Sequence, residues 1–239
     1  MTKEMKTSKD RAKLKQQRII KFFIDSANEI IKQDGVGAVT IRKAADLAGY
    51  TSATLYNYFD NLQHLVFLAT MTYLEEYNAA LPRYLKGSKN SIERYMLVCK
   101  CFAEFSFSDP EIYELLFFTH SDEKLEEYTK QYYDLFPERI VKDWPAPLNK
   151  IYVLNSIYSR SYMMLDDCIQ EGFITPEKAQ DFNDVNLRIY KTILQDVQEG
   201  ELTKKEAISK TMKYYFQLME YYMEPDALPL LKQVKQKLQ

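Results

Sequence analysis

Hydroxyl and amide side chains gather at positions 51–58, where the sequence reads Thr-Ser-Ala-Thr-Leu-Tyr-Asn-Tyr. Thr51 is a good N-cap for a short helix, and Leu55 and Phe59, four residues apart, would share its buried face. The opposite face then presents the hydroxyls and the amide to solvent. Such groups at the beginning of a helix suit phosphate oxygens and the edges of bases. The segment therefore favours contact with nucleic acid.

Residues that commonly carry enzyme or metal chemistry are sparse. The chain has two histidines, His64 and His120, so a histidine metal site or a Ser-His-Asp triad has few candidates. We expect both histidines to be surface or helix-cap residues. The carboxylates within residues 122–127 are expected to form a solvated face rather than a metal site. The sequence thus predicts no catalytic residue, no metal and no cofactor.

The composition and the cysteine spacing indicate the cellular compartment that we expect for the protein. Three cysteines, Cys99, Cys101 and Cys168, show no disulfide or metal-ligand spacing, which fits a reducing cytosol. The apolar fraction of 46% and the charged fraction of 28% are those of a soluble globular protein. No run approaches the roughly 20 apolar residues of a membrane span, and the Lys-rich N-terminus lacks the apolar stretch of a secretory signal. We therefore expect a cytoplasmic protein with no membrane partner.

Charge is distributed unevenly along the chain, whose formal net charge is −2. Residues 1–60 hold 11 Lys and Arg against 7 Asp and Glu, a balance of +4. Residues 61–239 hold the other 21 basic and 27 acidic residues, a balance of −6. A basic run alone is more often a solubilising tail. Beside the polar segment at 51–58, it suggests an electrostatic footprint for DNA.

A tight turn joins that segment to a preceding helix. Thr40 can cap this earlier helix through its hydroxyl, and Ile41, Ala45 and Ala48 recur on one face. Gly49 follows where the helix end needs a left-handed residue, a conformation that glycine adopts at little cost. Two short helices joined by a tight turn with glycine form the helix-turn-helix pattern.

The stretch 40–59, TIRKAADLAGYTSATLYNYF, followed by Asn61 and Leu65, resembles the DNA-binding signature of the TetR family of bacterial repressors. That signature is roughly T-[IV]-R-x-[IV]-A-x-x-A-G-[VY]-[ST]-x-x-[TS]-[LI]-Y-x-[YH]-F, and most of its fixed positions are met. The resemblance covers about the first quarter of the chain. It implies a dimeric regulator, most often a repressor, that binds a palindromic operator on double-stranded DNA and responds to a small-molecule effector.

The resemblance also implies roles by position within the motif. Phosphate contacts are implied for Thr40, Tyr56 and Tyr58, with Arg42 and Lys43 as further phosphate partners. Major-groove contacts are implied for Thr51, Ser52, Ala53, Thr54 and Asn57, with Ala53 suited to a thymine methyl. The sequence departs from the family at Asp60 and Leu62, where basic residues are usual.

The fold class predicted for the whole chain is all-α, because apolar residues recur at helical spacing and no hairpin or sustained alternation indicates a strand. Helices are expected over about 11–34, over 61–81 before Pro82, and over 148–171, among others. We predict a three-helix DNA-binding domain with a basic arm over 1–60. A larger helical domain for effector binding and dimerisation is predicted over 61–239.

The larger domain is rich in aromatic residues, and the whole chain has 19 Tyr and 13 Phe. Tyr offers a flat apolar face and a hydroxyl, which suits a pocket for a planar or amphipathic small molecule. Each ring taken alone is more often core filling. Because the resemblance implies an effector pocket, the candidate lining residues are Tyr95, Phe102, Phe105, Phe117, Tyr158 and Tyr162. Tyr73, Tyr77, Phe118 and Trp144 belong to the same wider aromatic group.

Two late helices, over about 177–199 and 203–223, are apolar on more than one face, which indicates burial on more than one side. The resemblance implies that such helices pair with their symmetry mates in a four-helix dimer bundle. The candidate interface residues are Phe182, Val185, Ile189, Ile193, Met212, Tyr215 and Met219. A thick core within one chain would produce the same pattern and stays the alternative.

Three classes of function compete on the sequence alone. The favoured class is a ligand-responsive, homodimeric DNA-binding regulator, which is not an enzyme. A second class keeps the fold but is regulated by a protein partner, and an exposed aromatic patch without an enclosed cavity would favour it. The weakest alternative is an all-α enzyme, given the scarcity of histidine.

Overall fold

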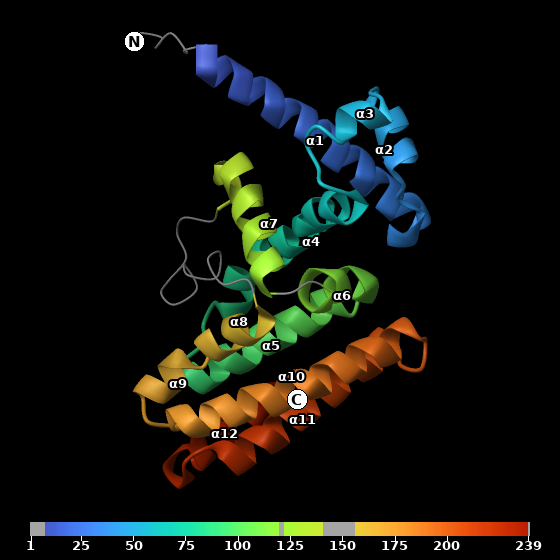
Figure 1. Cartoon of the computed structure of the whole chain (residues 1–239). Coiled ribbons are helices and arrows are strands. Elements are labelled where there is room, and N and C mark those ends of the chain that lie inside the picture. Colours follow the sequence, from blue (N-terminus) through green and yellow to red (C-terminus); the bar gives the residue numbers. More distant parts are fainter. Residues whose placement is uncertain (1–7, 120–121, 141–155, 239) are drawn as a thin grey trace. The chain divides into compact units, whose positions relative to one another are not determined.

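A computed structural model describes residues 8–119, 122–140 and 156–238, and these residues form helices and no strand (Figure 1). The α-helices are α1 Ser8–Asp34, α2 Ile41–Ala48, α3 Ser52–Leu55, α4 Leu62–Leu85, α5 Ser91–Ser106, α6 Pro110–Phe118, α7 Asp122–Leu135, α8 Ile157–Met163, α9 Asp166–Gln170, α10 Pro176–Gln198, α11 Lys204–Tyr222 and α12 Leu228–Leu238. Short 3-10 turns lie at η1 Val36–Ala38, η2 Pro137–Arg139 and η4 Pro225–Ala227. The predicted all-α fold is confirmed. None of the described helices is long and apolar enough to cross a membrane.

The chain divides into two compact units. The head comprises the described residues up to 72 together with 131–137, and the body comprises the other described residues. The predicted domain boundary at residue 60 precedes α4. In the structure the first part of α4, up to residue 72, packs with the head and belongs to that unit. The reason is packing, because Leu65 and Leu68 of α4 are fully buried in the part of the helix that belongs to the head.

The head is built on one buried face of α1. Its apolar residues at helical spacing, including Phe23 and Ala27, are fully buried, and α2 packs across them. The Phe23 ring meets the Phe59 ring edge-on, with centroids 5.8 Å apart, and it also contacts Tyr50 at 5.4 Å. Rings from α1, from the turn and from the end of the motif therefore form a common core.

The head also includes a segment that is distant in sequence, residues 131–137 at the end of α7. The Gln17 side-chain amide of α1 donates to the Leu135 carbonyl at 2.9 Å. Gln131 lies 2.8 Å from the ring of His64 on α4. Nothing local in the sequence of α7 indicates this association, and the sequence-based division assigned the segment to the larger domain.

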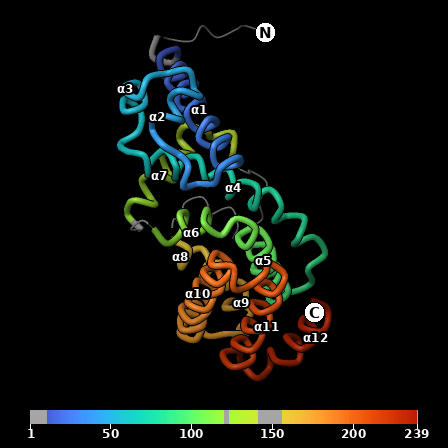
Figure 2. The backbone as a smooth tube through the Cα atoms, turned by 90° about the vertical axis from the view of Figure 1, so that its right-hand side faces the viewer, coloured from blue at the N-terminus to red at the C-terminus, as the bar shows by residue number. Residues whose placement is uncertain are grey.

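The body is a stack of helices in which α10 and α11 run side by side (Figures 1 and 2). α5 packs on α11 and α12, and α6 and α8 pack on α10. Two of the long helices begin at threonine caps. The Thr175 hydroxyl accepts from the Lys178 N–H, and Thr203 forms a reciprocal capping box with Glu206. These caps satisfy backbone donors that would otherwise lack partners at the helix ends.

Two predicted helices have different ends in the structure. α4 continues through Pro82 to Leu85, since an exposed proline in the last turn removes only one backbone bond. The helix predicted over 148–171 is, in its described part, the two short helices α8 and α9. The chain turns between them where the Leu165 N–H bonds to the Tyr162 carbonyl, three residues back, at 2.9 Å. Residues 148–155, Trp144 and His120 lie outside the described residues.

Candidate nucleic-acid interface and body cavity

Helix α2 begins and ends as the sequence predicts. The Thr40 hydroxyl accepts from the Lys43 N–H at 3.2 Å. Gly49 has φ 77 and ψ 26, the left-handed conformation, and its N–H bonds to carbonyls of the last turn. The Tyr50 N–H then bonds to the Ala45 carbonyl at 2.9 Å, which closes the turn. The orientation of the following helix is therefore fixed by backbone bonds.

Helix α3 is shorter than the predicted one. The Thr51 hydroxyl accepts from the Thr54 N–H at 3.2 Å, and regular α-helix ends at Leu55. Residues 56–58 continue as turns, and the Tyr58 N–H bonds to the Leu55 carbonyl at 2.9 Å. Leu55 and Phe59 are buried in the head core, as predicted. The core thus holds both ends of the segment while its polar residues face outward.

The residues predicted to contact DNA are accessible on one stretch of the head. The exposed ones are Thr40, Arg42, Lys43, Thr51, Ala53, Tyr56 and Asn57, and the half-buried ones are Ser52, Thr54 and Tyr58. The Thr51 and Thr54 hydroxyls lie 3.0 Å apart and share a hydrogen bond. These side chains are therefore accessible to a large partner such as a nucleic-acid duplex.

The basic residues of this surface are weakly engaged within the head. Arg42 Nε lies 3.8 Å from Asp46, and Lys43 Nζ lies 3.8 Å from Asp34, all on exposed side chains. Solvated ion pairs at such distances contribute little, roughly 0–1 kcal/mol. Both cations can exchange these partners for phosphate at small cost.

His64 is a correction to the sequence analysis, since it is buried, with 3% of its surface exposed, and not a surface residue. Its Nδ1 accepts from the Asp60 N–H at 3.2 Å, so Nε2 is the protonated nitrogen and donates to Gln131 Oε1 at 2.8 Å. The Asp60 carboxylate lies 3.6 Å from Nδ1. Asp60, which stands where the TetR signature usually has a basic residue, therefore fastens the end of the motif to α4. The sequence pattern gave no signal of this contact.

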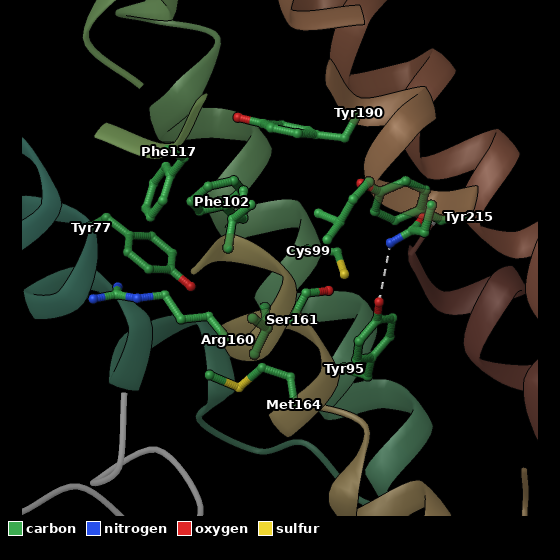
Figure 3. A pocket seen from close by; sticks show the side chains of 14 residues that line it. Tyr77, Tyr95, Cys99, Phe102, Phe117, Arg160, Ser161, Met164, Tyr190 and Tyr215 are labelled. Carbon is green, nitrogen blue, oxygen red and sulfur yellow. Dashed lines mark hydrogen bonds between the residues drawn. The ribbon is translucent and has the colours of Figure 1, made fainter. Parts of the chain in front are cut away.

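The body contains a partly open cavity between α5, α8 and α10 (Figure 3). Its walls are mainly aromatic and aliphatic, with a few polar side chains. The lining residues are Tyr77, Tyr95, Val98, Cys99, Phe102, Phe117, Ile157, Arg160, Ser161, Met164, Asn186, Leu187, Tyr190 and Tyr215. All of them belong to the body.

The cavity contains half of the predicted effector-site residues. Tyr95, Phe102 and Phe117 line it. Phe105 lies one turn further along α5 and packs against the Tyr77 ring instead, with centroids 6.2 Å apart. Tyr158 is 39% exposed, and Tyr162 is half-buried without lining the cavity. Tyr158 and Tyr162 therefore do not line the cavity, and other residues of α8 and α10 form its wall there.

Sequence reasoning passed over most of the polar lining residues, namely Cys99, Arg160, Ser161 and Asn186. Helical spacing contained a usable signal. Residues 157, 160, 161 and 164 recur as one face of α8, so a polar pair lies within an apolar stripe. Asn186 likewise interrupts the apolar face of α10. Polar residues that interrupt an apolar helix face therefore indicated the lining of the cavity.

Phe102 is the centre of the aromatic wall. Its ring lies 5.3 Å from Tyr77, 5.7 Å from Phe117 and 5.3 Å from Tyr190, mostly in edge-on or tilted contact. The Arg160 guanidinium carbon lies 5.7 Å from the Phe117 ring centroid, within range of a cation–π contact. Figure 3 shows Arg160 and the Tyr77 hydroxyl on the same side of the cavity.

Burial keeps the cavity's acidic groups protonated. It raises the pKa of Tyr77, Tyr95, Tyr190 and Tyr215 above the usual value, so their hydroxyls stay neutral. It also raises the pKa of the Cys99 thiol to about 12. Nucleophilic chemistry by Cys99 is therefore suppressed at neutral pH, because the thiolate is the reactive form. Within the described residues, no group of three or more His, Cys, Asp or Glu is placed to hold a metal ion.

The residues proposed for the dimer interface lie largely inside the chain's own core. Phe182, Ile193, Met212, Tyr215 and Met219 are buried, so these five cannot form a surface, and for them the alternative of a thick core holds. Val185 and Ile189 are half-buried and face outward on α10. Tyr221, on α11, is 79% exposed. The apolar excess of α10 and α11 therefore has two causes, a deep intramolecular core and an outer stripe.

The geometry of the head defines a helix-turn-helix segment, and comparison with known proteins assigns its family. Residues 23–68 match the model of the bacterial regulatory proteins of the tetR family. The N-terminal segment therefore matches that family, and the resemblance carried by the motif is confirmed. No curated protein matches the chain in sequence.

Solved structures share the fold over most of the chain. A Rhodococcus sp. protein assigned to the TetR family is 13% identical, with TM-score 0.52, over 86% of this chain and 99% of that chain. A TetR transcription regulator from Haloarcula marismortui is 14% identical, with TM-score 0.53, over 87% and 99%. Thermus thermophilus FadR, a TetR-family repressor in complex with lauroyl-CoA, is 12% identical, with TM-score 0.53, over 84% and 92%. At such identities the likeness shows the fold alone.

Proposed function

We propose that the protein is a cytoplasmic transcription regulator that binds a palindromic operator as a homodimer, acts as a repressor, and responds to a small molecule in the body cavity. The observation that supports this most is the pairing, in one chain, of an accessible tetR-type segment with an aromatic-lined cavity. The proposal assigns no catalytic role to His64, whose two ring nitrogens both have partners within the head core.

In the DNA complex, some residues of the helix-turn-helix segment would contact bases and others would contact phosphates. Thr51, Ala53 and Asn57 would face base edges, and Tyr56 with the basic pair Arg42 and Lys43 would contact phosphates. One head of this size makes too few contacts for specificity. A two-fold dimer reads two half-sites about one helical turn, or a multiple of it, apart.

The dimer interface we propose is the outer stripe of α10 and α11, defined by Val185, Ile189, Leu218 and Tyr221, all of them exposed or half-buried. It replaces the five predicted residues that the core occupies. Sedimentation equilibrium of an Ile189→Glu, Leu218→Glu variant should give a monomer where the unaltered chain is a dimer. Leu47→Glu, which alters an exposed apolar residue of the head, is the control and should leave the dimer intact.

A small effector is favoured over a protein partner because the aromatic residues gather around a cavity. The T. thermophilus FadR complex with lauroyl-CoA is a case of a similar fold that binds a small organic molecule. A ligand that binds better in one separation of the two heads would shift the population toward it. The resulting change in DNA affinity is typically about 1–3 kcal/mol.

The test is selection of bound sequences from a random duplex pool at a stated, moderate salt concentration, which matters because phosphate contacts are screened by salt. A two-fold symmetric consensus is the expected result. The matched control is the Tyr56→Phe, Asn57→Ala variant, which alters only exposed side chains and should fold normally. If the folded protein enriched no sequence, the head would not read DNA, and a search for a protein partner would follow.

A further inference from the structure

We propose that the body cavity takes a compact hydroxylated aromatic compound, a phenol. Its ring would lie against Phe102 and Phe117, and its hydroxyl would bond to the Asn186 amide. The proposal rests on the proposed function and deepens it by naming the chemical class of the effector. Three features of the cavity carry it, which are an unsatisfied buried amide, the shape and size of the walls, and the sign of the buried charge.

The first feature is Asn186, which lines the cavity with 1% of its surface exposed. Its side-chain nitrogen donates to the Tyr95 hydroxyl at 3.2 Å, the dashed line of Figure 3. Its Oδ1 has no hydrogen-bond partner within the described chain. A buried acceptor without a donor is costly, so a ligand that supplies one gains affinity. A hydroxyl suits this position because it both donates and accepts.

The second feature is the shape of the cavity. Phe102, Phe117 and Tyr77 present ring faces and edges to one side of it, as Figure 3 shows. Aromatic rings in such a wall favour a further ring in offset or edge-on contact. The cavity volume is about 60 Å³, roughly the room of four to six waters. That volume suits a single ring with small shifts of side chains, and a long acyl chain would have to extend out of the cavity.

The third feature is charge. Arg160 is buried, and its guanidinium lies against Phe117. None of the described lining residues is an Asp or a Glu. A cationic ligand would therefore meet the like charge of Arg160, and burying a second positive charge among these walls is unfavourable. The same wall accepts a neutral ring with a polar edge.

Calorimetric titration of the full-length protein with four probes tests the assignment. The probes are phenol, toluene as its isostere without a donor, benzylamine as a cation at neutral pH, and octanoate as a linear acyl chain. Phenol should bind about three- to tenfold more tightly than toluene, the effect of one neutral hydrogen bond. Benzylamine should bind more weakly than toluene because it carries the same charge as Arg160. Octanoate should also bind more weakly than toluene, because a linear chain cannot make ring contacts with Phe102 and Phe117, and this loss should outweigh the attraction of its carboxylate to Arg160. Tighter binding of octanoate or benzylamine, equal binding of phenol and toluene, or no binding of phenol would each overturn the proposal.

Two variants locate the effect. Asn186→Leu should remove the preference for phenol over toluene while toluene still binds. Asn183→Leu is a close control on the same helix, because Asn183 is also buried, donates to the Tyr158 carbonyl at 3.0 Å and has an unpartnered Oδ1, but does not line the cavity. It should keep the preference. Loss in Asn183→Leu and retention in Asn186→Leu would contradict the assignment.

The outcome is separable from that of the proposed function. Probe binding is measured on the protein without DNA, whereas operator selection needs no ligand. A phenol preference that depends on Asn186, in a protein that enriches no DNA sequence, would leave this inference standing and remove the regulator. A symmetric operator with no phenol preference would do the reverse. If Asn186→Leu failed to fold, the ranking of the four probes on the unaltered protein would decide.

Discussion

The head and the body place their candidate functional residues in opposite environments. In the head, Tyr56 and Asn57 stand exposed on a short segment whose two ends, Leu55 and Phe59, are buried. In the body, Asn186 and Tyr95 are buried and form a hydrogen bond, although they lie 91 positions apart in sequence. A partner too large to enter the protein must be met by exposed groups on a rigid support. A small partner can be surrounded, so its specificity depends on tertiary packing.

The two regions should therefore differ in their response to mutation. Altering an exposed residue of the head should change binding and leave folding intact. In the body, the residues that would bind the ligand also form the core, so binding and stability are coupled there. The following predictions test this contrast, beginning with the largest expected effect.

The largest effect is expected at the base of the head. Phe23→Ala removes a fully buried ring that contacts Phe59 and Tyr50, and should lower the free energy of unfolding by about 3–5 kcal/mol. Denaturant titration measures this change. Phe22→Ala is the neighbouring control, with 53% of the side chain exposed, and should cost under about 1 kcal/mol. Similar losses in the two variants would show that the α1 core is misassigned.

At the exposed surface, Asn57→Ala should alter sequence preference by about 1–3 kcal/mol, the value of a good base contact. Tyr56→Phe should weaken binding to all sequences by a similar factor, because it removes a phosphate contact. Competitive binding to the selected operator and to variants with single base changes measures both. A change of preference in Tyr56→Phe with unchanged overall affinity would reverse the two roles. Denaturation midpoints should be unaltered in both variants.

The turn between α2 and α3 isolates backbone strain from side-chain contacts. Gly49→Ala forces a left-handed conformation on a residue with Cβ and should cost about 1–2 kcal/mol of stability, although nothing obstructs the added atom. Gly37→Ala also meets no neighbour, and its φ is not positive, so it should be neutral or slightly stabilising. Thermal unfolding of both variants distinguishes the cases, and equal stabilities would show that the turn tolerates strain.

The body contains a buried carboxylate whose effect depends on pH. Burial opposes ionisation of Glu93, but hydrogen bonds from the Lys237 ammonium and the Lys89 N–H outweigh it and lower its pKa below the usual 4.5. Because the folded-state pKa is lowered, the stabilisation is present above about pH 4.5 and is lost as the pH falls through the folded-state pKa.

Glu93→Gln should therefore destabilise the protein at neutral pH by about 1 kcal/mol, a value kept small because Lys237 is half-exposed. The difference from the unaltered chain should shrink below pH 4.5. Denaturant titrations across pH 3–7 would measure it. Glu123→Gln, at an exposed position on α7, should show no comparable pH dependence. A constant difference at all pH values would point to a packing effect.

Local sequence was enough for the motif. The Thr40 cap, the left-handed Gly49 and the Thr51 cap are each decided by residues within a few positions of one another, and the structure has all three. The burial of Leu55 and Phe59 followed from their spacing. The length of α3 was overestimated because turns with Tyr and Asn share the periodicity of a helix.

Tertiary packing decided what periodicity leaves ambiguous. An apolar face on α10 or α11 has the same pattern whether it meets its own chain or a second copy, so Tyr215 was assigned to an interface and proves to line the cavity. His64 and Asp60 gave no pattern at all, since their partner Gln131 arrives from α7.

The sequence alone therefore determined the helical class, the caps and the helix-turn-helix segment, because backbone bonding and spacing act over a single turn or two. Only the tertiary structure decided which rings surround the cavity, that Asn186 keeps an unpaired oxygen there, and which end of α7 completes the head. Those properties depend on which of several similar apolar faces meet, a choice made by close packing of the whole chain.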